Sequence, residues 1–94
     1  MKKFETRAAL DIGSAQTKIT VADVNVSSNK IVQIHHQSLK FVYLRKDLAM
    51  SQENILSESI QSHLIETLKE MRLASAVYNP SKWMAAGTSV FRQA

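Results

Sequence analysis

The hydrophobic period of the sequence changes near the middle of the chain, and this change constrains the fold more than any other feature. Three stretches in the first half, 7–12, 17–24 and 30–44, are apolar or alternate between apolar and polar residues, as strands do. Residues 51–75 instead place Leu, Ile and Met three or four positions apart, which is typical of one helix face. Residues 82–87 are a last short apolar stretch. The sequence therefore predicts three antiparallel strands, one helix and a fourth strand.

Local signals add detail to this pattern. Ser51 is expected to cap the helix, with Glu53 in its first turn. In the third stretch, the apolar residues change from even-numbered to odd-numbered positions near His36–Ser38. This change predicts a β-bulge there. Three aromatic side chains are expected in the core or in cross-strand pairs: Trp83, Phe41 and Tyr43.

The order of the elements sets the fold class. A strand that follows a helix packed on the sheet is expected to run parallel to the central strand. Residues 88–94 are expected to form a loop that passes into a second helix. A sheet of four strands with one full helix leaves one face thinly covered. We therefore expect an α/β fold in which residues 1–94 are the first part of a longer domain.

The charge of the chain favours anionic partners. The net charge is +4, and it lies entirely in residues 1–50, which hold eight Lys or Arg against four Asp or Glu. A positive field of this size attracts phosphates without choosing among them. The basic residues are scattered and have no interleaved aromatics, so nucleic acid is not expected as a partner.

Several other classes of protein are excluded or disfavoured. The chain has no cysteine, which excludes disulfides and thiolate metal sites. No apolar stretch approaches the ~20 residues of a membrane span or forms a signal peptide, so we expect a cytoplasmic protein and no membrane partner. His35 and His36 are adjacent and are expected to point to opposite faces of a strand. With His63 on the helix, they form no visible ligand set for a metal.

The segment LDIGSAQTKITVAD, residues 10–23, has the composition of a phosphate-binding turn. Asp11 ends the first strand, and Gly13 permits a positive φ that would turn backbone amides outward. Hydroxyls and a cation are close by in the sequence: Ser14, Thr17 and Lys18. The Asp11 carboxylate is suited to Mg²⁺, held directly or through water. The alternative is an ordinary hairpin tip whose polar side chains satisfy turn amides.

A second segment, AAGTSVFRQA at 85–94, repeats this chemistry at the end of the last strand. Thr88 and Ser89 supply hydroxyls, and Arg92 follows close to an expected helix start. The first and last strands are expected to be parallel neighbours, so both segments would emerge at the same edge of the sheet. The alternative is a helix cap beside a solvated arginine.

These two segments resemble the exopolyphosphatase/guanosine pentaphosphate phosphohydrolase family. That family has a D-[IL]-G-S-N-S turn near its N-terminus and, later, a strand that ends in A-T-S-A-[LV]-R-x-A. The present chain departs from it in having Ala15 and Gln16 after D-I-G-S, Lys18 where the family usually has no lysine, and Phe91 before the arginine. The family has the ribonuclease-H-like, actin-like ATPase fold, which begins with three strands, a helix and a fourth strand.

The resemblance implies roles for particular residues. Phosphate binding would fall to Asp11, Gly13, Ser14, Thr88, Ser89 and Arg92. Asp11 would also face the expected cofactor, Mg²⁺. The general base of the family lies further along its sequence, beyond Ala94 here, so no catalytic residue is expected within the chain. The implied reaction is hydrolysis of the terminal phosphate of inorganic polyphosphate or guanosine pentaphosphate, and a homodimer is compatible with the resemblance.

Two other functions stay open at the level of sequence. One is an ATP-binding member of the same superfamily, either a sugar-type kinase or an actin-like assembly protein, whose D-x-G-[ST] loop contacts ATP phosphates. The T-S-x-x-R segment argues against this alternative, since those families do not usually share it. The other is a small interaction module that binds no ligand.

Overall fold

The computed structural model describes residues 3–87, and its sheet has four strands. In chain order the elements are β1 (Phe4–Ile12), β2 (Gln16–Asn25), β3 (Ile31–Phe41), α1 (Leu44–Ala49), α2 (Glu58–Ala76) and β4 (Lys82–Gly87). The sheet order is β3-β2-β1-β4. β1 is antiparallel to β2 and parallel to β4, which confirms the predicted α/β class and the direction of the last strand.

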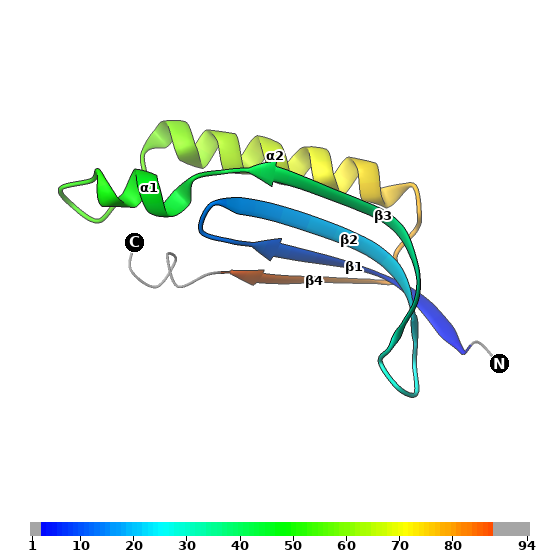
Figure 1. Cartoon of the computed structure of the whole chain (residues 1–94). Coiled ribbons are helices and arrows are strands. Elements are labelled where there is room, and N and C mark those ends of the chain that lie inside the picture. Colours follow the sequence, from blue (N-terminus) through cyan, green and yellow to red (C-terminus); the bar gives the residue numbers. More distant parts are fainter. Residues whose placement is uncertain (1–2, 88–94) are drawn as a thin grey trace.

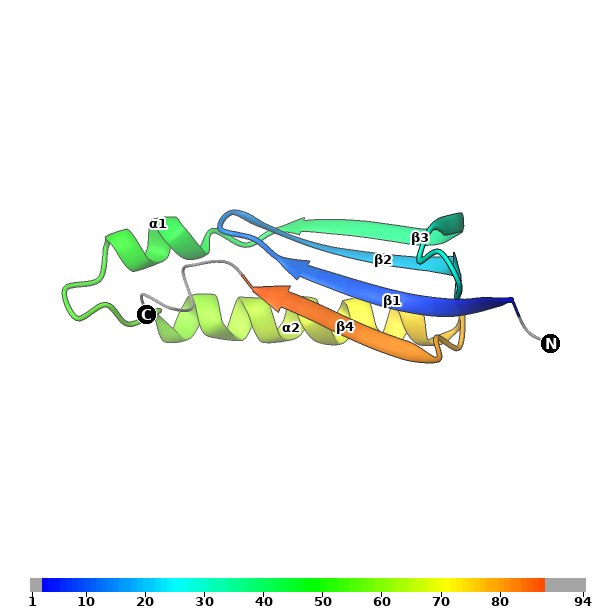
Figure 2. The ribbon, with the colours of Figure 1, turned by 90° about the horizontal axis from the view of Figure 1, so that it is seen from below.

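Helix α2 packs on one face of the sheet, as Figures 1 and 2 show from two sides. Side chains of β2 alternate between the two faces, and the buried set on the helix side includes Thr17, Ile19 and Val21. Met71, on the apolar stripe of α2, is buried as well, so the helical period read from the sequence is confirmed. Polar contacts tie β3 to the same helix, with Lys40 Nζ 3.9 Å from Glu70 Oε2.

A short helix that the sequence analysis did not predict, α1, packs beyond the tip of the β1–β2 hairpin (Figure 1). Val42, Leu44 and Leu48 are buried there. They pack against four partly buried residues: Ile12, Leu56, Ile60 and Leu64. The third strand therefore ends at Phe41 and not at residue 44, because burying Leu44 and Leu48 on one face of a helical turn outweighs continuing an edge strand.

The N-cap of α2 is Ser57, so the expectation that Ser51 caps this helix is wrong. Ser57 Oγ accepts a hydrogen bond from the Ile60 N–H at 3.2 Å. Asp47 of α1 reinforces the cap, because its carboxylate accepts from the Ser57 N–H at 2.8 Å and from the Ser57 hydroxyl at 2.6 Å. Ser51 Oγ instead accepts from the N–H groups of Glu53 and Ile55, so it stabilises the connecting loop.

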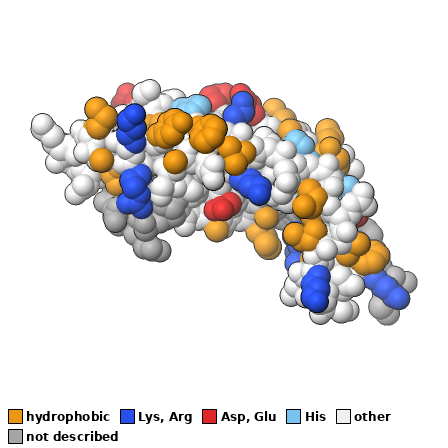
Figure 3. All heavy atoms as spheres, in the orientation of Figure 1, with side chains coloured by type: hydrophobic (Ala, Val, Ile, Leu, Met, Phe, Trp, Pro, Cys, Tyr) orange, Lys and Arg blue, Asp and Glu red, His pale blue; other side chains and the backbone are white. Residues whose placement is uncertain are grey.

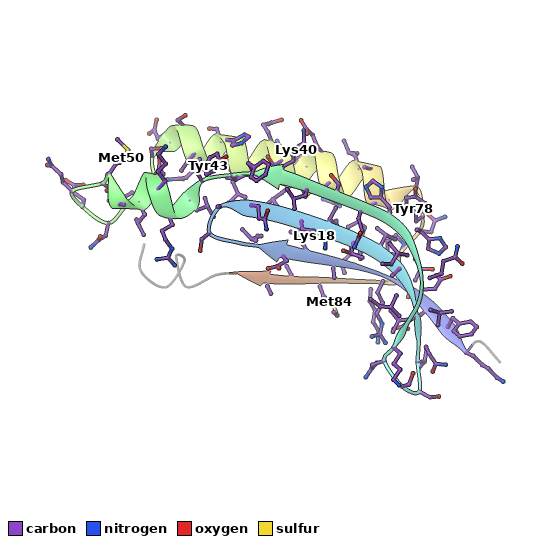
Figure 4. The ribbon with its side chains drawn as sticks, viewed as in Figure 1. Lys18, Lys40, Tyr43, Met50, Tyr78 and Met84 are labelled. Carbon is purple, nitrogen blue, oxygen red and sulfur yellow. The ribbon has the colours of Figure 1, made fainter. Side chains whose placement is uncertain are left out.

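Strand β3 contains the predicted bulge, slightly upstream of its expected place. Val21 pairs with His36 and Ala22 with Ile34, which leaves His35 as the extra residue, and a second irregularity follows at Val32. The bulge re-aims the side chains, so the expectation that the two histidines point to opposite faces is wrong. The rings of His35 and His36 both stack on Tyr78, with ring centroids 5.8 Å apart in each pair. This contact joins the C-terminal end of α2 to β3 (Figure 4).

Large apolar side chains are exposed along β3 and β4. The three aromatic residues expected in the core or in strand pairs are 47%, 58% and 51% exposed: Trp83, Phe41 and Tyr43. Phe41 and Tyr43 stack on each other with centroids 6.0 Å apart, in a region where Figure 3 shows hydrophobic side chains gathered. On the sheet face away from α2, a groove of about 410 Å³ runs between Ala9, Ala22 and Ile34. No element among residues 3–87 covers that groove.

We predict that residues 1–94 in isolation are marginally stable or self-associate, because exposed apolar strand and sheet surface promotes association. Light scattering after gel filtration should give an apparent mass that rises with concentration, together with binding of a hydrophobic dye. A monomer with a sharp, high melting transition would contradict this prediction.

We also predict that Asp47→Ala destabilises the chain by about 1–2 kcal/mol, because the Ser57 amide and hydroxyl both lose an acceptor. Denaturant unfolding would measure the change. Glu53→Ala removes an exposed carboxylate from the loop between α1 and α2; it is the matched control and should stay within about 0.5 kcal/mol of the parent chain. Equal changes in the free energy of unfolding for the two variants would show that Asp47 does not stabilise the cap.

Candidate functional site

The candidate site lies at the sheet edge where β1 and β4 both end. These parallel strands keep register to their last residues, with Asp11 opposite Ala86 and Ile12 opposite Gly87. The last residues of β1 and β4 therefore lie side by side at this edge. Ligands of open α/β sheets bind at such carboxyl edges. Thr88, Ser89 and Arg92 follow at once in the sequence and lie outside the described residues.

The turn from Gly13 to Ala15 needs its glycine for space. The Gly13 N–H donates to the Gln16 carbonyl at 2.8 Å, which closes the turn. The expectation of a positive φ is wrong, since no glycine among residues 3–87 has one. A Cβ at Gly13 would instead lie 2.8 Å from the Gln16 carbonyl oxygen, which is too close for any side chain. Only glycine lets the chain approach itself this closely while keeping the hairpin register.

Backbone groups at the start of α1 hold the tip of this turn. The Ala15 carbonyl accepts from the Val42 N–H at 3.0 Å, and the Ser14 carbonyl accepts from the Arg45 N–H at 3.1 Å. The carbonyls of the turn are thus directed toward α1. A turn whose carbonyls are occupied in this way presents a defined backbone to any ligand, because its peptide planes cannot rotate freely.

The side chains named from the sequence fall on different faces. Asp11 is exposed on the open sheet face, opposite Lys18 in the antiparallel register. Lys18 and Met84 line the groove on that face (Figure 4). Thr17 alternates to the helix side and is fully buried, and its hydroxyl has no hydrogen-bond partner among the described residues. Thr17 therefore does not belong to the mouth of the turn, because the strand period turns it inward.

Arg45 is a cation at this turn that the sequence analysis missed. Its Nη2 lies 3.5 Å from Ser14 Oγ, although the two residues are 31 positions apart. No local pattern relates a residue after the third strand to the first turn. The contact arises because α1 packs over the hairpin tip, and α1 itself was not predicted.

The described residues offer one acidic side chain of the turn for a metal ion. Within residues 3–87, no group of three or more His, Asp or Glu could hold a metal by itself. Mg²⁺ commonly keeps several waters and binds through one or two carboxylates plus substrate phosphates, and the exposed Asp11 carboxylate fits this mode.

A cluster of ion pairs lies near the N-terminal end of β1, at the opposite end of the strand from the turn. Glu5 pairs with Arg7 and Lys82, and hydrogen bonding to the Arg7 guanidinium is the main cause that lowers the pKa of the Glu5 carboxyl. This cluster supports the β1–β4 pairing, away from the turn.

In the described part of the chain, neither helix has the length and apolar character that crossing a membrane requires.

Comparison by sequence finds no matching protein-family model and no matching curated protein. Solved structures do match. An Aquifex aeolicus member of the Ppx/GppA protein family superposes with a TM-score of 0.81 at 22% identity, over 97% of this chain and 28% of that one. The chain has the actin-like half-domain fold of the Ppx/GppA proteins.

Two further structures agree with this fold. An exopolyphosphatase-like protein gives a TM-score of 0.84 at 17% identity, over 99% of this chain and 27% of that one. An exopolyphosphatase from Cytophaga hutchinsonii gives 0.78 at 19% identity, over 95% and 27%. The predicted strand-strand-strand-helix-strand half-domain is thus confirmed as a Ppx/GppA fold, apart from the additional α1. The chain spans less than a third of the length of these structures.

We predict that Gly13→Ala destabilises the chain by roughly 1–3 kcal/mol, because the new methyl group collides with backbone and the hairpin must shift. Thermal unfolding would measure this change. Ala15→Ser adds an atom at an exposed position of the same turn and should change stability by less than about 0.5 kcal/mol. A Gly13→Ala chain as stable as the parent would show that the turn relaxes without cost.

Proposed function

We propose that this chain is the phosphate-loop part of a Ppx/GppA-type phosphohydrolase. The complete protein would release terminal phosphate from inorganic polyphosphate or guanosine pentaphosphate with the help of Mg²⁺. One observation carries the proposal: β1 and β4 end side by side in a Ppx/GppA fold, and the D-I-G-S motif and the T-S-x-x-R segment lie in the sequence at these two strand ends. Both segments combine hydroxyls with a charged side chain suited to phosphate chemistry.

The roles follow from the chemistry of the residues. The turn at Gly13 and Ser14 would bind phosphate oxygens through the Ser14 hydroxyl and backbone N–H groups beyond Gly13, while the Gly13 N–H stays bonded to the Gln16 carbonyl and holds the turn closed. Asp11 would hold Mg²⁺ directly or through water, and the ion would neutralise charge on the phosphate being transferred. Thr88, Ser89 and Arg92 would bind the same anion from the neighbouring strand end. The carboxylate that activates water would follow Ala94, so residues 1–94 alone should not turn over substrate.

A second candidate function is ATP binding, as in a sugar-type kinase or an actin-like assembly protein. The observation that favours it is the half-domain fold itself, since a D-x-G-S turn at the end of β1 suits the phosphates of ATP equally well. The substrate decides between the two candidates, because the first predicts hydrolysis of polyphosphate or guanosine pentaphosphate and the second predicts use of ATP.

The experiment that tests the proposal is phosphate release by the complete protein. Long-chain polyphosphate, guanosine pentaphosphate and ATP are offered in parallel, each with and without Mg²⁺. Mg²⁺-dependent release from either of the first two, with ATP untouched, supports the proposal and names the substrate. Turnover of ATP alone would assign the protein to the kinase or actin branch.

Within that assay, we predict that Asp11→Asn abolishes Mg²⁺-dependent release and leaves the fold intact, because Asp11 is exposed and its loss creates no cavity. Circular dichroism checks the fold. Glu53→Gln, which neutralises an exposed carboxylate of the α1–α2 connection, is the control and should keep full activity. Unchanged activity of Asp11→Asn would exclude Asp11 from the mechanism.

Arg92→Ala should weaken the binding of anionic chains, and the loss should be larger at low salt, where charge interactions are less screened. Equilibrium binding of polyphosphate at two ionic strengths measures the effect. An affinity that does not change at low ionic strength would make Arg92 a structural residue.

A further inference from the structure

Two exposed aromatic rings lie beside the candidate phosphate turn. Phe41 and Tyr43 are 58% and 51% exposed, and their rings stack nearly parallel, with planes 10° and centroids 6.0 Å apart. The residue between them, Val42, donates its N–H to the Ala15 carbonyl of the turn at 3.0 Å. This hydrogen bond fixes the aromatic pair next to the hairpin tip, at the end of β3 where Figure 4 labels Tyr43.

The packing at this junction holds both rings outward. Val42 and Leu44 are fully buried in the cluster beneath α1, so the residues that alternate with them, Phe41 and Tyr43, face solvent. His63 Nε2 lies 3.1 Å from the Phe41 carbonyl oxygen and ties the end of the strand to α2. Rings on so constrained a backbone lose little further freedom when a ligand stacks on them, which favours affinity.

Phe41 shares the open sheet face with Asp11. Phe41 is opposite Gln16 in the β2–β3 register, and Lys18, two residues further along β2, is opposite Asp11 in the β1–β2 register. Residues directly opposite each other point to the same face of a sheet. Two strand spacings and two residues separate Phe41 from Asp11, which places their Cα atoms about 12 Å apart. A nucleoside with its phosphate chain can span this separation.

We propose that Phe41 and Tyr43 form a nucleobase-stacking platform, and that the ligand of this site is a nucleoside polyphosphate and not inorganic polyphosphate. The inference rests on the proposed function, because it selects among the substrates of the same site. Every base has a flat π face that stacks on aromatic rings. An inorganic chain has only phosphate groups, which gain nothing from an apolar ring. A nucleotide is the ligand that uses both the turn and the rings.

The chain offers matched variants. Phe41→Ala and Tyr43→Ala each remove one ring, Phe41→Leu keeps apolar volume without a π face, and Tyr43→Phe keeps the ring without its hydroxyl. Ile31→Ala is the control, because Ile31 is 59% exposed at the opposite end of the same strand. A general effect of losing exposed apolar surface from β3 would appear in the control, whereas loss of a stacking platform would not.

The test is calorimetric titration of the complete protein, in the presence of Mg²⁺, with three ligands that resist hydrolysis. Two are the β,γ-imido analogues of GTP and ATP, and the third is inorganic diimidotriphosphate, a phosphate chain with no base. At least one nucleotide analogue should bind wild type more tightly than the inorganic chain does. Phosphate release from guanosine pentaphosphate and polyphosphate is measured on the same samples, and circular dichroism checks the fold.

The expected losses are specific to the nucleotide. Phe41→Ala, Tyr43→Ala and Phe41→Leu should each weaken nucleotide binding about tenfold, in the range measured for loss of one base–aromatic stack. Tyr43→Phe and Ile31→Ala should stay within about twofold of wild type, since both keep the two rings. Binding of diimidotriphosphate should be the same in all variants.

Each other outcome has a defined meaning. Unchanged nucleotide affinity in both alanine variants overturns the platform, as does wild type that binds the inorganic chain as tightly as either nucleotide. An equal loss for the inorganic chain makes the rings a support for the turn and also overturns it. The expected losses in a protein that releases no phosphate support the platform and reject the proposed hydrolase. Release from polyphosphate without nucleotide binding does the reverse. If the alanine variants do not fold, unchanged nucleotide affinity in Phe41→Leu contradicts the platform.

Discussion

The parallel pairing of β4 with β1 is the constraint on which the rest of the structure depends. To lie parallel to β1, β4 must begin beside the start of that strand, and the chain must travel the full length of the sheet to reach that point. Helix α2 makes this return: 19 residues extend ~29 Å, close to the ~30 Å of a nine-residue strand. The match in length leaves Gly87 opposite Ile12, so the ends of two strands that are far apart in the sequence lie side by side at one edge.

The start and end of α2 are fixed by different interactions. At its N-terminus, Asp47 and Ser57 form a shared cap that also anchors α1. Near its C-terminal end, Tyr78 stacks on the two histidines of the β3 bulge, and Asp23 pairs with His35 at 3.0 Å. The helix is thus held to α1 at its start and to β3 near its end, and its apolar stripe packs on the sheet between these two points.

The candidate site combines a rigid turn with solvent-exposed charge. The close approach at Gly13 and the hydrogen bonds from the Val42 and Arg45 N–H groups fix the backbone, while the Asp11 side chain is exposed beside it. In the proposed function, the exposed Asp11 carboxylate would hold a partly hydrated Mg²⁺ that arrives with the phosphate. The open sheet face beside Asp11 carries Lys18 and a shallow groove, so the site is continuous with surface that no described element covers.

The sequence by itself determined the period of each element and therefore the fold class. Alternation along β2 and the Leu, Ile and Met spacing of α2 depend on neighbouring residues alone, so strand, helix and burial follow from them. The D-I-G-S turn and the end of β4 were also readable, because each is local. Tertiary structure decided what depends on distant partners. The helix starts after Ser57 and not after Ser51, because Asp47 supports the cap at Ser57. Helix α1 forms because Leu44 and Leu48 are buried together, and it places Arg45 beside Ser14, 31 positions away in the sequence. Such contacts arise only when separate elements share one core, and no pattern within a single segment encodes them.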